Sequence, residues 1–170
     1  FAGITGAAIV AAIFALVWES VPVTVVGDRE PAFPELVERI NDVGAIEITT
    51  ADYRFTVRGE GDEWGVEERN GYVVKRETVR KFILEMANLR LVEGKTTLPD
   101  RYGYLQVEDP TAKEAGSRGI RILDRDGDLL GAGVIGSRKF FLYVDGRGGT
   151  YLRRDGDARA WLAEGEVNFG

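Results

Sequence analysis

The first eighteen residues read FAGITGAAIVAAIFALVW (residues 1–18) and contain neither a charged residue nor a proline. As a helix rising about 1.5 Å per residue, they would span roughly 27 Å, close to the hydrocarbon thickness of a bilayer. Trp18 stands where interfacial aromatic residues anchor a spanning helix. The pattern therefore predicts one transmembrane helix at 1–18, followed by a water-facing domain.

Two other interpretations of this stretch remain open. A secretory signal peptide has a shorter apolar core that ends in a cleavage site of small residues, whereas Leu16, Val17 and Trp18 are bulky. A buried core helix normally has a polar face, which this stretch lacks. Both interpretations fit the residues less well than a membrane anchor does.

Small residues follow one side of the predicted anchor and would let another helix approach closely. They include Gly3, Gly6, Ala7 and Ala11. We expect this face to pack on a partner helix in the membrane. The alternative is that alanine is present only as a good helix former.

The polar flank of the anchor bears on its orientation. Residues 19–30 carry Glu19, Asp28 and Glu30 against a single Arg29, which is not the basic loop typical of the cytoplasmic side. We therefore expect a bacterial inner-membrane protein with its soluble domain in the periplasm. Because the sequence opens on Phe1 and not on methionine, we also expect residues upstream that contribute to topology.

Composition excludes several functions. The chain has 28 acidic against 22 basic residues and a net charge of −6, so we expect no nucleic-acid partner. It has no run of five like charges, so we also expect no disordered interaction tail. It has no cysteine and no histidine, which removes thiol chemistry, the commonest general base and the commonest metal ligand. We expect no enzymatic activity, no cofactor and no metal.

Hydrophobic periodicity predicts an α+β domain at 35–170, preceded by an extended linker at 19–34. We expect a largely antiparallel sheet with helices packed on one side. The predicted helices are 35–43, 76–91 and 158–164, the last capped by Asp157. The predicted strands are 45–50, 53–58, 63–68, 72–74, 119–123, 129–135, 139–144 and 150–154, with the segment 96–104 as a loop.

Two motifs resemble ligand-binding loops. Asp124, Asp126 and Asp128 suggest calcium, but a calcium loop needs glycine at its sixth position and a glutamate at its twelfth, and an Asp-Gly hairpin turn also explains the stretch. The glycines of 131–136 match G-x-G-x-x-G, but that motif needs a helix directly after it, and we expect a strand there.

Acidic and aromatic residues supply the remaining candidates. The pairs Glu67–Glu68 and Asp62–Glu63 would have to converge for carboxylate catalysis, yet neighbours on a strand point to opposite faces. An alternative function is a periplasmic binding module for a polysaccharide, lipid or peptide. Its candidate surface aromatics are Trp64, Tyr102, Tyr104 and Tyr143.

The order of several sequence blocks resembles one bacterial family. These blocks are TADYRFTVRGEGDEW (50–64), ETVRKFILEMANLRLVEGKT (77–96), RYGYLQVEDP (101–110), GIRILDRDGDLLGAGVIG (119–136) and TYLRRDGDARAWLAEGEV (150–167). With the N-terminal anchor, they resemble the family catalogued as domain of unknown function 4340.

The resemblance implies a role but no catalytic residues. Such proteins tend to be encoded beside an ABC-type ATPase, a permease and a gliding-motility-type auxiliary protein. The resemblance therefore implies a non-enzymatic accessory subunit of an exporter-like assembly. Members often carry two copies of the unit, which would make this chain the first half of a longer protein.

Overall fold

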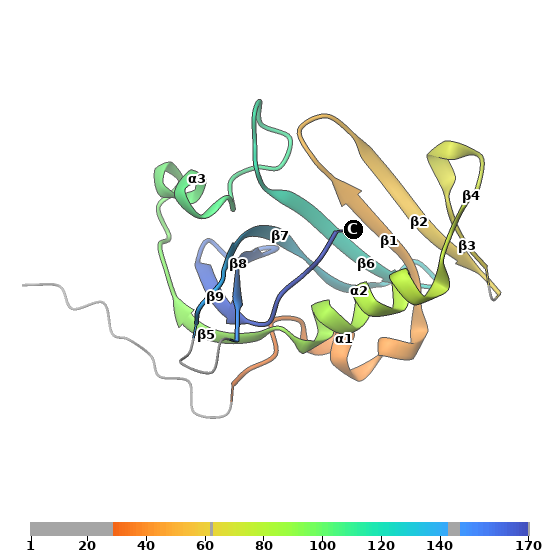
Figure 1. Cartoon of the computed structure of the whole chain (residues 1–170), viewed down its shortest axis with the longest axis horizontal. Helices are drawn as coiled ribbons and strands as arrows, with labels where there is room; N and C mark the ends of the chain where they lie inside the picture. Colours follow the sequence, from red (N-terminus) through yellow and green to blue (C-terminus); the bar gives the residue numbers. More distant parts are fainter. Residues whose placement is uncertain (1–28, 62, 143–146, 170) are drawn as a thin grey trace, which may run out of the picture.

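A computed structural model of the chain describes residues 29–61, 63–142 and 147–169. These residues form one antiparallel sheet of nine strands with a few short helices, which confirms the predicted α+β class (Figure 1). The strands are β1 (Val43–Thr49), β2 (Arg54–Glu60), β3 (Glu63–Val66), β4 (Tyr72–Val74), β5 (Arg90–Gly94), β6 (Arg118–Asp124), β7 (Leu129–Lys139), β8 (Gly149–Arg154) and β9 (Ala160–Glu164). The helices are α1 (Pro34–Glu38), α2 (Arg76–Asn88) and α3 (Tyr102–Leu105), with 3-10 turns η1 (Ile40–Asp42), η2 (Glu67–Arg69) and η3 (Pro99–Arg101).

The strands of the second half of the chain lie in the sheet between two strands of the first half. From edge to edge it is β4-β3-β2-β1-β6-β7-β8-β9-β5. The strands β1 to β4 form one meander and β6 to β9 form another, and the two meet where β1 pairs with β6. Because β5 pairs with β9, the second meander lies between β1 and β5.

Strand register builds one apolar face across the centre of the sheet. Ile46 lies opposite Val57 of β2 and opposite Ile122 of β6. All three side chains are buried in the main hydrophobic core. Since successive residues of a strand point to opposite faces, this register defines the core face.

The helix α2 covers the core face because its apolar residues repeat at helical spacing. Its buried residues are Val79, Phe82, Ile83, Met86 and Ala87. They belong to the same cluster as the buried side chains of the sheet. The helix follows β4 at one sheet edge and leads into β5 at the other, so it runs across the face, with α1 beside it (Figure 1).

The short helix α3 packs on the opposite face. Leu152 of β8 joins the main core, whereas its neighbour Tyr151 packs in a second cluster with Tyr102 of α3 and Ala160 of β9. Neighbouring residues of a strand point to opposite sides of the sheet. The expectation that the helices pack on one side therefore holds for α1 and α2 but not for α3.

The predicted helix at 158–164 is wrong, because residues 160–164 form strand β9. Asp157 does accept a hydrogen bond from the Arg159 backbone N–H, at 2.8 Å, as a helix cap would. However, β9 pairs with β8 on one side and with β5 on the other. Sheet pairing on both sides replaces the hydrogen bonds that a helix would make.

Other element boundaries also differ from the prediction. The strand β7 is continuous to Lys139, and a bulge between Ile135 and Arg138 replaces the predicted break. Residues 140–142 are not in a strand, and the rest of the predicted strand 139–144 lies outside the described residues. The predicted helix 35–43 is divided into α1 and η1, with Val43 already in β1.

The segment after α2 was predicted incompletely. The helix ends at Asn88, and Leu89 adopts an extended conformation with φ −61° and ψ 125°. The strand β5 follows immediately, so its first two residues lie within the helix predicted at 76–91. Within 96–104, predicted as a loop, η3 and the start of α3 form short helical turns.

In the described parts of the chain, no helix has the length and apolar character needed to cross a bilayer. The predicted anchor at 1–18 lies outside those parts. The same holds for its small-residue face at Gly3, Gly6, Ala7 and Ala11.

Candidate functional site

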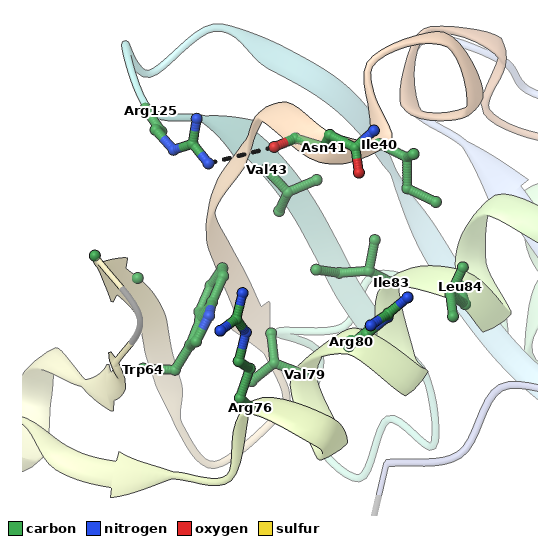
Figure 2. Close-up of a pocket in the computed structure, with 12 residues that line it drawn as sticks. Ile40, Asn41, Val43, Trp64, Arg76, Val79, Arg80, Ile83, Leu84 and Arg125 are labelled. Atoms are coloured by element: carbon green, nitrogen blue, oxygen red, sulfur yellow. Dashed lines mark hydrogen bonds between the residues drawn. The ribbon is translucent and has the colours of Figure 1, made fainter.

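A groove opens between α2 and the start of the first meander. It encloses about 510 Å³. Its described lining residues are Ile40, Asn41, Val43, Gly59, Gly61, Trp64, Arg76, Val79, Arg80, Ile83, Leu84 and Arg125. Figure 2 shows them around the groove, on α2, η1, the start of β1, the β2–β3 hairpin and the β6–β7 turn.

The base of the groove is apolar. Val43, Val79 and Ile83 are each at most 8% exposed, and Leu84 adds a side chain that is 42% exposed. Val43, Val79 and Ile83 also belong to the main hydrophobic core, so the groove lies where this core reaches the surface. The groove can therefore accept an apolar side chain as well as a polar group.

The position of the Trp64 ring in the groove depends on a glycine in the neighbouring strand. Gly59 lies directly opposite Trp64 in the β2–β3 ladder. A Cβ atom at position 59 would lie 2.9 Å from two atoms of the indole ring. Glycine thus leaves room for the indole to lie across β2, where it is half-buried.

Three arginines surround this base. Arg76 and Arg80 are four residues apart on α2 and therefore lie on the same side of the helix. Arg125 comes from the β6–β7 turn, and its guanidinium donates a hydrogen bond to the Asn41 carbonyl at 3.3 Å (Figure 2). None of the described lining residues is an aspartate or glutamate.

The groove is therefore locally cationic on a chain of net charge −6. Guanidinium groups stay protonated at any physiological pH and bind carboxylates or phosphates through two parallel hydrogen bonds. The arrangement can bind an anionic group that also carries an apolar part. The described lining residues include no nucleophile with an adjacent base, and their arginines suit the binding of an anion.

Asp124 fixes the turn that presents Arg125. One carboxylate oxygen accepts the backbone N–H groups of Asp126 and Asp128 at 2.9 and 2.8 Å, and the other accepts a hydrogen bond from Arg39. Burial alone would raise the pKa of Asp124. These hydrogen bonds outweigh that effect and lower the pKa below its ordinary value.

The same contacts explain the Asp124–Asp128 motif without calcium. The Asp124 carboxylate oxygens accept hydrogen bonds from the turn backbone and from Arg39. Gly127 provides the positive φ of +93° that the turn requires. Across the residues that the structure describes, no group of three acidic side chains is placed to hold a metal ion. The stretch is the Asp-Gly hairpin turn that was the alternative interpretation.

We expect Asp124 to make folding stability depend on pH below about 4. Its pKa is lower in the folded than in the unfolded chain, so its contribution is present above the unfolded pKa. That contribution is lost as pH falls through the folded pKa. Urea unfolding at a series of acidic pH values should show a shallower pH dependence for Asp124→Asn than for wild type. Asp126→Asn in the same turn is the control, and equal slopes for wild type and Asp124→Asn would contradict the assignment.

The G-x-G-x-x-G motif lies entirely within β7 and leads into no helix. A Cβ at Gly136 would lie 2.3 Å from the Leu105 carbonyl oxygen, and one at Gly131 would lie 3.3 Å from Phe33. These glycines allow other segments to pack closely on the strand. They do not form a phosphate-binding loop.

Glu67 and Glu68 do not converge on a common site. Glu67 forms an ion pair with Arg58, whereas Glu68 accepts the Thr56 backbone N–H at 2.8 Å. This hydrogen bond from Thr56 lowers the pKa of Glu68. Glu63 is exposed at the start of β3, and Asp62 lies outside the described residues.

Of the four candidate aromatics, the three that the structure describes are not brought together. Trp64 lines the groove. Tyr102 is only 7% exposed, stacks under the Arg153 guanidinium and donates its hydroxyl hydrogen bond to the Ala158 carbonyl. Tyr104 is 85% exposed, but α3 and β3 lie at opposite ends of the molecule (Figure 1). Tyr143 lies outside the described residues.

Sequence reasoning did not identify the arginines of the groove. The spacing of Arg76 and Arg80, four residues apart on a predicted helix, was a usable signal for a shared face. No local pattern could place Arg125 beside them, because it reaches the groove only through the pairing of β6 with β1.

In comparisons with known proteins, no family model, no curated protein and no solved structure matches the chain. The function of the groove is therefore argued from its own residues.

Proposed function

We propose that this chain is a non-enzymatic accessory protein whose folded domain binds an acidic segment of a partner protein in the arginine-lined groove. The observation that carries the proposal is that Trp64, Arg80 and Arg125 line one groove with an apolar base. An acidic peptide with an apolar side chain matches both parts of this surface. A bare inorganic anion would leave the apolar base uncovered.

The rest of the proposal places the domain at a membrane. The apolar residues 1–18 would form a single-pass anchor in a bacterial inner membrane, with the domain in the periplasm. The small-residue face of the anchor would contact a permease or another membrane protein. The resemblance described above favours an ABC-type, gliding-motility-like transport system as the assembly.

A matched cross-linking experiment tests the groove in the full chain. A photoreactive amino acid is placed at Leu84, at the edge of the groove, and in a second protein at Tyr104 on α3. After irradiation in native membranes, mass spectrometry identifies the partner and the cross-linked peptide. We expect an acidic peptide of a membrane-associated protein to be captured from position 84 and not from position 104.

Other outcomes of the cross-linking would change the proposal. Equal capture from both positions, or a captured peptide without acidic residues, would contradict the groove as the binding site. Capture of lipid or polysaccharide from position 84 would replace the peptide with another ligand. A permease as the captured protein would support the transport-system assignment.

A further inference from the structure

Two consecutive phenylalanines protrude where the β7–β8 hairpin leaves the sheet. Phe140 is 62% exposed and Phe141 is 80% exposed, directly after the end of β7 at Lys139. The Leu142 N–H donates to the Arg147 carbonyl at 2.9 Å, which ties the two sides of the hairpin together beyond the ladder. The phenylalanines thus occupy a defined position and bury little of their apolar surface in the domain.

Basic residues flank the phenylalanines on the β7 side. Lys139 is exposed, and the Arg138 guanidinium lies 5.6 Å from the centre of the Phe140 ring. Arg138 also contacts Asn168 at 2.9 Å and Glu166 at 3.6 Å. Exposed aromatic residues beside cationic side chains suit the interface of an anionic bilayer, where rings enter the headgroup layer and the cations meet lipid phosphates.

The sheet register places this hairpin end in line with the segment that follows the predicted anchor. Lys139 pairs with Gly149, Gly149 with Glu164, Glu164 with Arg90, and Arg90 with Pro31. Four steps of about 4.8 Å between strands place Lys139 roughly 19 Å from Pro31.

Side-chain contacts bring the same two segments together. Arg29 and Arg147 both form ion pairs with Glu164 at the end of β9. Only ten residues separate Trp18 from Arg29, and such a segment reaches at most about 35 Å when extended. With residues 1–18 in the bilayer, this segment is short enough for the hairpin end to reach the membrane surface.

We propose that Phe140 and Phe141 insert into the interfacial layer of the same bilayer that residues 1–18 cross, with Lys139 facing anionic headgroups. This inference rests on the membrane anchoring in the proposed function. It gives the domain a second attachment point and so fixes its orientation. Because β3, which carries Trp64, is separated from β8 by four strands in the sheet, the groove would remain open to a partner.

Site-specific fluorescence in the full chain tests this insertion. The protein contains no cysteine, so Phe141→Cys provides one labelling site for the environment-sensitive dye NBD. The labelled protein is reconstituted into liposomes of phosphatidylcholine and phosphatidylglycerol that contain a lipid with a nitroxide near the headgroup. We expect several-fold stronger quenching at position 141 than at Tyr104→Cys or Tyr72→Cys, which occupy α3 and β4.

Liposome flotation separates failure of this inference from failure of the anchoring. If the protein floats with liposomes but position 141 is quenched no more than the two controls, insertion of the hairpin end is excluded while the anchor stands. If the protein does not float, the anchoring is excluded and the inference falls with it.

Second-site variants test the proposed contacts in the labelled protein. Phe140→Ser and Lys139→Glu should each reduce quenching at position 141. Tyr53→Ser, which removes another aromatic residue of 60% exposure, should not. Unchanged quenching in both Phe140→Ser and Lys139→Glu would overturn the proposed mode of insertion.

Discussion

We expect Met86→Ala to lower the free energy of unfolding by about 2–5 kcal/mol, the range found when a large buried side chain is cut back to alanine. Met86 is 1% exposed and lies on the side of α2 that faces the sheet. It belongs to the cluster that joins α2 to Ile122 and Leu152. Removing its side chain leaves a cavity in the layer that holds the helix on the sheet, so both transfer energy and packing are lost.

Leu84→Ala is the matched control for this prediction. Leu84 lies on the same helix but is 42% exposed, so we expect a loss below about 1 kcal/mol. Urea unfolding of the full chain, followed by circular dichroism in a mild detergent, measures both variants. A loss for Met86→Ala no larger than for Leu84→Ala would show that α2 is not held through this side of the helix.

We expect the double variant Arg80→Glu, Arg125→Glu to weaken binding of an acidic peptide by about 100-fold. Each reversed charge removes a guanidinium–carboxylate contact and adds repulsion, and a tenfold loss per site corresponds to about 1.4 kcal/mol. Titration of the peptide captured from position 84, labelled with a fluorophore, measures the affinity. Wild-type binding should also weaken as salt is raised, because salt screens exposed charges.

Arg101→Glu, Lys113→Glu is the charge-matched control. Both residues are exposed, and neither lines the groove. We expect this variant to bind the peptide within about threefold of wild type at physiological salt, since distant surface charges are largely screened. Equal losses in the two double variants would mean that net charge, and not the groove, determines binding. Circular dichroism of each variant verifies that the fold is retained.

The first hairpin and α2 were predictable from the sequence because their signals are local. Ile46, Ile48, Phe55 and Val57 alternate as expected for half-buried strands, and they face one another in the observed register. The apolar residues of α2 repeat at helical spacing. In both elements, the local pattern and the tertiary environment favour the same structure.

The error at β9 shows why some elements could not be predicted locally. Asp157 makes the short-range hydrogen bond of a helix cap, and the five residues of β9 are too few for periodicity to distinguish a strand from a helix. What decides the outcome is pairing with β8 on one side and, on the other, with β5, about seventy residues earlier in the chain. A similar long-range effect places Arg125 in the groove.

The interleaved strand order has a consequence for how the protein is made. Because synthesis starts at the N-terminus, β1 to β4, α2 and β5 are made before β6 to β9. At that stage no strands are present to join β1 to β5 in the sheet. The buried side of α2 then lacks the core residues that β6 to β9 contribute, among them Ile120, Ile122 and Leu152. The sheet is complete only when β6 to β9 have been synthesised and have paired between β1 and β5. Because the sheet cannot close without these last strands, we expect the domain to complete its folding only after residues 118–164 have been synthesised.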